Sequence, residues 1–443
     1  MEKTLGEAIR LALEAAETAT PAPDSKTWDY GWCIESYRRS GHASITSPNG
    51  PIMLSIEGIQ AFEHLVTILQ KQPIIKDRWD SEDFWGVMAS LVAFISTVEN
   101  RPEVAKRNLE MILSRRPAVV AFPVANIDWQ GPPRRFGGGF LIGILGGEFS
   151  EKLATMGEAA RDSAGKVSEY VNEQSHRPPL VGFAAVVPAQ GQQAFHHAKR
   201  AFELLVDLAI LLDRKKIENS LFSIRGGSNR PGVRGLALDR TVINASMKAS
   251  GDSADLACRP FIQDARGTLK SAYWHSADRV PLEKMLSNNE LAGAVDKCLA
   301  GKSNITRRVQ VAARWFSESF WAESEDDSVL AAGVALDSLV GSRSGLPGRA
   351  MKERYAFLEE EPGKRSDKAR EWDEIYSARS AIAHGGESQK VKEPGFARRA
   401  QGIVTWTAWR LLEAERHFLL EDKNKSLDSL FEEMRWGTCD WDS

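Results

Sequence analysis

Cysteines and long apolar runs are both scarce in this 443-residue sequence. Its four cysteines lie far apart and form no C-x-x-C pair, so we expect neither a disulfide framework nor a zinc site, and a reducing cytosol is the expected compartment. No run of roughly 18 or more apolar residues occurs, which predicts no membrane-spanning helix. The first residues carry acidic side chains within an amphipathic pattern, unlike a signal peptide.

An excess of positive charge is also absent. The chain has 57 Lys and Arg against 60 Asp and Glu, for a formal net charge of −3, so any nucleic-acid-binding surface has to be local. The glycine-rich segment QGPPRRFGGGFLIGILGG, residues 130–147, lacks the G-x-x-x-x-G-K-[ST] order of a P-loop. We interpret it as a turn that enters a strand, and we predict no cofactor and no metal site.

The character of the sequence changes near residue 300. Helices are predicted over 2–18, most of 50–115 and 192–213, and short apolar runs bounded by Pro or Gly predict buried strands at 117–127, 140–147 and 178–189. Beyond residue 300 the pattern is purely helical to about residue 420. We therefore predict an α+β region over 1–300, of one or two subdomains with a sensing or regulatory role. An all-α domain over 301–425 follows, and the acidic tail over 426–443 is expected to be a weak appendage.

One predicted helix, residues 367–384, carries an arginine inside its apolar stripe. The stripe is expected to consist of Trp372, Ile375, Tyr376 and Ala383, with Arg379 near its centre. Because a guanidinium keeps its proton, burying it requires an anionic partner, and Asp337 of the sequence VALDSLVG is the candidate. His384 lies roughly 140° round the helix from Arg379 and directly precedes two glycines that end the helix. We therefore expect the imidazole at an exposed rim.

The stretch 306–420 resembles the HEPN superfamily, and within it the Apea-like HEPN group. That group carries an R-x(4–6)-H motif, often RSxIxHGG, at the end of its last helix but one. The matching residues here are Arg379, Ser380, Ile382, His384, Gly385 and Gly386. An earlier helix of the group usually carries ALE, where this chain has ALD with Asp337 in place of the glutamate.

The resemblance implies an all-α HEPN-like helical bundle and a metal-independent endoribonuclease without cofactors. RNA would be cut by its own 2′-hydroxyl to leave a 2′,3′-cyclic phosphate, with Arg379 and His384 as catalytic residues, while Asp337 and Ser380 support them. A histidine, with an ordinary pKa near 6.5, suits proton transfer, and arginine suits phosphate oxygens. One histidine per chain is few for acid and base together, so a homodimer formed through the helical domain is expected. The implied role is a cytoplasmic prokaryotic toxin or antiviral defence effector of the abortive-infection kind, triggered through residues 1–300.

Alternative interpretations stay open at this point. Many HEPN domains are inactive, so the helical part is alternatively a dimerisation and partner-binding module, and an enzyme seated in residues 1–300 is a third class. The basic, glycine-rich segment 223–235 offers Arg225, Arg230 and Arg234 as RNA contacts, against the simpler interpretation of a solvent-exposed loop. A second arginine–histidine spacing, Arg410 with His417, falls in mid-helix and is interpreted as a solvated face with stem packing.

Overall fold

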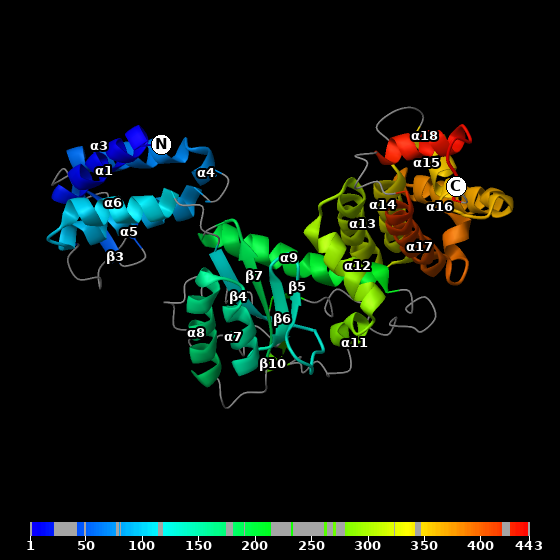
Figure 1. Ribbon diagram of the computed structural model, residues 1–443, viewed down its shortest axis with the longest axis horizontal. Helices are drawn as coiled ribbons and strands as arrows, with labels where there is room; N and C mark the ends of the chain where they lie inside the picture. Colours follow the sequence, from blue (N-terminus) through cyan, green and yellow to red (C-terminus); the bar gives the residue numbers. More distant parts are fainter. Residues whose placement is uncertain are drawn as a thin grey trace.

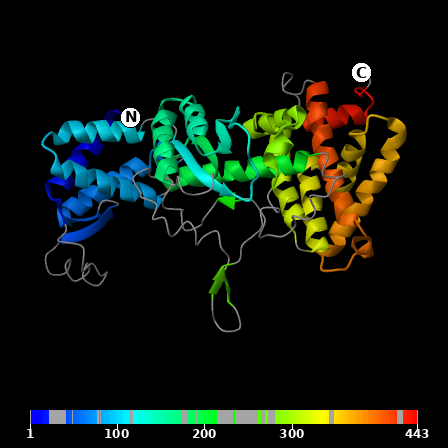
Figure 2. The same ribbon diagram turned by 90° about the horizontal axis from the view of Figure 1, so that it is seen from below.

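The computed structural model is mostly helical, with a small antiparallel sheet in the N-terminal part (Figure 1). It describes residues 2–21, 42–47, 50–76, 79, 81–113, 118–173, 180–189, 191–213, 232–233, 261–263, 269–271, 280–322, 324–341, 347–418 and 426–441. The predicted RNA contacts Arg225, Arg230 and Arg234 therefore lie outside the described residues. Figures 1 and 2 both show an elongated arrangement, with N-terminal helices at one end, the sheet in the middle and C-terminal helices at the other end.

The N-terminal part is a helical unit with its own apolar core. It contains α1 (Glu2–Glu17), α3 (Ile56–Gln70), α4 (Pro73–Lys76), α5 (Ser81–Thr97) and α6 (Arg101–Leu113). A small sheet of order β1-β3-β2 packs beside them, built from β1 (Thr20–Pro21), β2 (His42–Ser47) and β3 (Gly50–Ser55). Strand β3 ends where α3 begins, because the Ser55 hydroxyl accepts the Gly58 amide at 3.2 Å and caps the helix. This small sheet was not predicted from the sequence.

The central sheet lies between two helical layers. Its strands are β4 (Ala118–Ala125), β5 (Arg134–Phe136), β6 (Phe140–Ile144) and β7 (Val181–Val187), in the order β5-β6-β7-β4, with the two-residue β8 (Gly232–Val233) beyond β4. All neighbours pair antiparallel. Helix α9 (Gly191–Leu212) packs on one face, and α7 (Gly147–Ala154) with α8 (Glu158–Glu173) packs on the other (Figure 1). A separate hairpin joins β9 (Phe261–Gln263) to β10 (Leu269–Ser271). The three predicted strands are confirmed, whereas β5, α7 and α8 were not predicted.

Every described element after residue 281 is helical. These elements are α11 (Leu282–Leu286), α12 (Asn289–Ala300), α13 (Asn304–Trp321), α14 (Glu325–Val340), α15 (Pro347–Phe357), α16 (Arg365–Ala383), α17 (Phe396–His417), α18 (Leu427–Arg435) and the 3₁₀ turns η7 (Pro362–Lys364) and η8 (Gln389–Lys392). Gly301 in the left-handed conformation ends α12, and a capping box between Ser303 and Thr306 starts α13. Among the described residues, no helix combines the length and the apolar character that a bilayer span requires.

The apolar core does not stop at the predicted boundary near residue 300. One cluster of buried side chains runs from Val120 on β4 to Trp441, and α9 contributes to both the sheet side and the helical side of that cluster. The Trp409 indole on α17 donates to the Leu212 carbonyl at the end of α9 at 2.8 Å. The division into domains at residue 300 thus stays a prediction, and the packing that crosses it is extensive.

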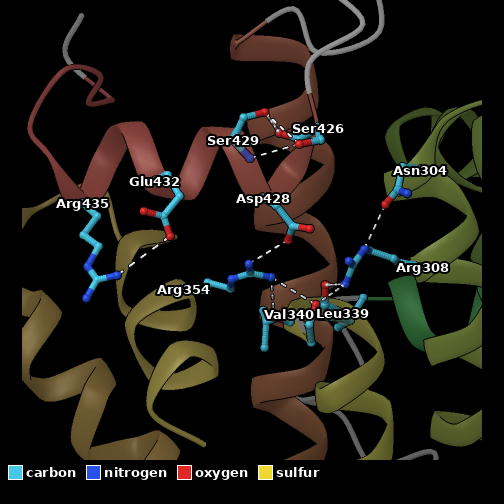
Figure 3. Close-up of polar contacts among 11 residues, drawn as sticks. Asn304, Arg308, Leu339, Val340, Arg354, Ser426, Asp428, Ser429, Glu432 and Arg435 are labelled. Carbon is cyan, nitrogen blue, oxygen red and sulfur yellow. Dashed lines mark hydrogen bonds and ion pairs between the residues drawn. The ribbon is translucent and has the colours of Figure 1, made fainter. Parts of the chain in front are cut away.

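The prediction that the C-terminal tail is a weak appendage is wrong. Helix α18 buries Leu427, Leu430, Phe431 and Met434. Asp428 of this helix forms an ion pair of 2.7 Å with the buried Arg354 (Figure 3). The buried Trp441 donates to the Phe357 carbonyl at 2.9 Å and lies 4.1 Å from the Arg410 guanidinium. The apolar positions of α18 recur at helical spacing, so this acidic segment has a buried face despite its charge.

Candidate functional site

The last turn of α16 places His384 on the surface. The amide of His384 donates to the Ser380 carbonyl at 3.1 Å, and the amide of Gly386 donates to the Ala381 carbonyl at 2.9 Å. Gly385 has a φ of 75°, in the left-handed region where a side chain is strained. The helix therefore ends at the two glycines, as predicted, and the His384 side chain is exposed.

The buried face of α16 differs in part from the predicted stripe. Trp372, Ile375 and Ala378 are buried, and Tyr376 is half-buried. Ala383, which was expected to be buried, is exposed, so that part of the prediction is wrong. Ala383 lies only about 20° round the helix from the buried Trp372, so its exposure comes from its position in the last turn, where α16 ends.

Arg379 is paired with the predicted acid. Its Nη1 lies 2.8 Å from Oδ2 of Asp337 on α14, and the two side chains keep 27% and 20% of their surface exposed. The guanidinium is thus half-buried, with an ionic partner and with access to solvent. Its Nε is buried and has no hydrogen-bond partner. The pair satisfies the requirement that a guanidinium inside an apolar stripe be matched by an anion.

Burial dominates the electrostatics of Asp337. Removal from solvent raises the pKa of this carboxyl, and the charge of Arg379 opposes the rise without cancelling it. Desolvation therefore outweighs attraction at this carboxylate, so the ion pair carries an electrostatic cost.

The helix that carries Asp337 is fixed at its C-terminal end by two arginines that the sequence did not single out. Arg308 on α13 donates to the Gly341 carbonyl at 2.8 Å, and the buried Arg354 on α15 donates to the same carbonyl at 3.1 Å. Both also reach carbonyls of the last turn of α14 (Figure 3). Cations at a helix C-terminus meet its unpaired carbonyls and favour its dipole. The position of Asp337, less than two turns earlier, is set by this anchoring.

Three basic residues that follow His384 are matched by acids. Lys390 and Arg399 both pair with Glu374, at 3.1 and 2.9 Å, and Lys392 pairs with Glu387 at 2.6 Å. The other predicted supporting residue, Ser380, is half-buried and uses its carbonyl to hold the His384 amide. In the part of the chain that the structure describes, no three His, Cys, Asp or Glu side chains gather as a metal-binding group.

Arg379 and His384 lie near the same end of α16, but their side chains extend to different sides of the helix. Side chains on a helix tilt toward its N-terminus, so the guanidinium reaches back to Asp337, whereas the imidazole sits at the helix terminus. Arg410 and His417 form no comparable site, because both side chains lie against Trp441, with the imidazole centroid 5.5 Å from the indole centroid. A single chain therefore offers one anion-binding group and one imidazole at the end of α16.

Comparison of the chain with protein-family models, with curated proteins and with solved structures found no match.

Proposed function

We propose that this protein is a metal-independent endoribonuclease of the HEPN type that cuts RNA through the end of α16. The observation that carries the proposal is the exposed imidazole of His384 at a glycine-terminated helix end, five residues after an arginine that is only partly covered. Packing does not require an imidazole at this exposed position. Together with the RSAIAHGG sequence, this arrangement supports proton transfer beside a bound phosphate.

The reaction would use the RNA itself as the nucleophile. The 2′-hydroxyl loses its proton to a base as its oxygen attacks the neighbouring phosphorus. The bond from phosphorus to the 5′-oxygen then breaks as that oxygen takes up a proton. The products are a 2′,3′-cyclic phosphate and a free 5′-hydroxyl. His384 would transfer one of these protons, and Arg379 would offer its donors to the oxygens that gain charge in the transition state.

A second copy of the chain would complete the chemistry. The reaction needs one group that takes a proton and another that gives one, and the end of α16 supplies one imidazole. Two copies related by a two-fold axis would bring two His384 side chains to one RNA phosphate. The proposal therefore includes a homodimer through the helical part, with RNA as the substrate and a toxin or defence role in the cell.

The test is cleavage of a labelled RNA oligonucleotide by the purified full-length protein in the presence of EDTA. We expect products that end in a 2′,3′-cyclic phosphate, and a loss of rate of roughly 10²- to 10⁴-fold in His384→Ala. His197→Ala is the matched control, because His197 is an exposed histidine on α9. Equal cleavage by His384→Ala and wild type, or no cleavage by either, would reject the proposal.

The second candidate is a non-catalytic dimerisation and partner-binding module. It is favoured by the ion pair itself, because Asp337 already neutralises Arg379 and this leaves a purely structural explanation for the arginine. This candidate predicts that expression of wild type and of His384→Ala affects cell growth equally. The ribonuclease proposal predicts growth arrest that His384→Ala relieves.

A further inference from the structure

Gly333 lies in the middle of α14, where a glycine is unfavourable. A glycine in a helix interior is less stable than an alanine, because its backbone loses more freedom on folding. A Cβ at this position would lie 2.6 Å from Cδ and 2.9 Å from Cγ of Arg379. The space left by the missing side chain is therefore filled by the aliphatic stem of Arg379.

Gly333 and Asp337 are four residues apart, so they lie one above the other on the same face of α14. The stem of Arg379 crosses the first, and its guanidinium meets the second at 2.8 Å. The Arg379 Cβ, which is fixed to its backbone, would itself come within 3.1 Å of a Cβ at position 333. A larger residue at 333 would therefore move the outer part of Arg379 and press α14 away from α16.

The position of the Arg379 stem in the gap at Gly333 determines which guanidinium nitrogen an anion can reach. A side-on contact requires Nε, and Nε is buried without a hydrogen-bond partner. Nη1 is paired with Asp337, so Nη2 is the guanidinium nitrogen that is left for an incoming anion. The orientation follows from the stem lying flat in the gap at Gly333.

We propose that Gly333 is the positioning residue of this site, because the gap it leaves holds Arg379 where an RNA phosphate meets Nη2 of its guanidinium. The phosphate part rests on the proposed ribonuclease function. The positioning part rests on the contacts between α14 and Arg379 alone, so the two can fail separately.

The positioning part is tested by thermal unfolding of the full chain in a double-mutant cycle. We expect Gly333→Ala to lower Tm in the wild-type background, because the added methyl collides with the Arg379 stem. In the Arg379→Ala background the stem is gone, so the same change should leave Tm unchanged or raise it. Gly293→Ala on α12 is the control, because a Cβ there meets no atom within 4 Å, and it should behave alike in both backgrounds. A Gly333→Ala loss that is equal in both backgrounds would overturn the inference.

The phosphate part is tested by the kinetics of RNA cleavage with Gly333→Ala at a temperature where it is folded. We expect kcat to fall roughly 10- to 100-fold, as for a small misplacement of a catalytic group, while Gly293→Ala keeps the wild-type rate. An unchanged kcat in Gly333→Ala would overturn the claim that the positioning of Arg379 by Gly333 matters for RNA cleavage. If the stability cycle shows coupling but wild type cuts no RNA, the proposed function fails and the positioning of Arg379 by Gly333 stands.

Discussion

The ion pair between Lys297 and Glu415 joins α12 to α17 across residue 300, and its two members differ sharply in exposure. Nζ of Lys297 lies 2.8 Å from Oε2 of Glu415, and the lysine side chain is 37% exposed, whereas the glutamate side chain is 2% exposed. Apart from this ion pair, neither carboxylate oxygen of Glu415 has a hydrogen-bond partner. The ammonium is therefore the group that compensates the buried negative charge.

The difference in exposure predicts an asymmetry between the two single variants. Lys297→Met leaves a buried carboxylate without its cation, which should cost about 3 kcal/mol, the lower end for a broken buried pair, because solvent already screens the lysine. Glu415→Gln leaves a lysine that water can reach, which should cost less than about 1 kcal/mol.

Urea unfolding of the full chain, followed by tryptophan fluorescence, measures these losses. The double variant, Lys297→Met with Glu415→Gln, should be more stable than Lys297→Met alone, because the stranded charge is gone. Equal losses in the two single variants would refute the reasoning. A loss below about 0.5 kcal/mol in Lys297→Met would also refute it, and would mean that the carboxylate reaches water by local opening of α12.

Three further predictions concern residues elsewhere in the chain. Burial, with a smaller contribution from Glu415, raises the pKa of the Cys298 thiol from 9.0 to about 12. Stability should therefore fall as the pH rises from 9.0 towards 12, because only the unfolded chain ionises in that window, and Cys298→Ala should flatten this dependence in pH-dependent denaturation. Glu283→Ala should cost about 1 kcal/mol in the same assay, because the amides of Gln130 and Gly131, which donate to its carboxylate at 2.5 and 2.8 Å, lose their acceptor. The exposed Lys284→Ala should cost little. Trp441→Ala should cost about 3 kcal/mol in thermal unfolding, and an unchanged Tm would restore the weak-appendage interpretation.

The sequence was most informative where apolar runs were long and uniform. Strands β4, β6 and β7 follow from short buried runs between Pro and Gly, since a strand covered on both faces has no polar alternation. Helices α7 and α8 were missed because their buried faces use small or few side chains, such as Ala160 and Ala164 on α8. Helix α18 was missed because acidic residues between its apolar positions suggested a solvated segment. In each of these helices the apolar residues recur at helical spacing, but the amino-acid composition of the segment concealed the pattern.

At the candidate site, the sequence predicted the ionic partner of Arg379 but not the glycine against which its stem packs. Asp337 could be found because a buried guanidinium demands an anion, and this acid stood alone within the apolar stripe of its helix. Gly333 could not be found in the same way. A glycine within a helix signals a loss of stability, and its use appears only when the neighbouring helix shows which atoms fill the gap. The spacing of residues along one helix carries no information about which face of a neighbouring helix packs against them.

The two motif residues Arg379 and His384 are not equally diagnostic. Arg379 is already explained by Asp337, so removing it leaves a partly desolvated carboxylate unpaired and weakens packing under either proposed function. A loss of activity in Arg379→Ala therefore does not separate a ribonuclease from a structural module. His384 is exposed, and its helix ends through backbone bonds and glycine conformation that an alanine at position 384 leaves in place. Replacing it should change stability by no more than about 0.5 kcal/mol, as for surface positions in general. An unfolding curve identical to that of wild type, together with a loss of RNA cleavage, therefore assigns chemistry to the imidazole, and an unaltered cleavage rate assigns none.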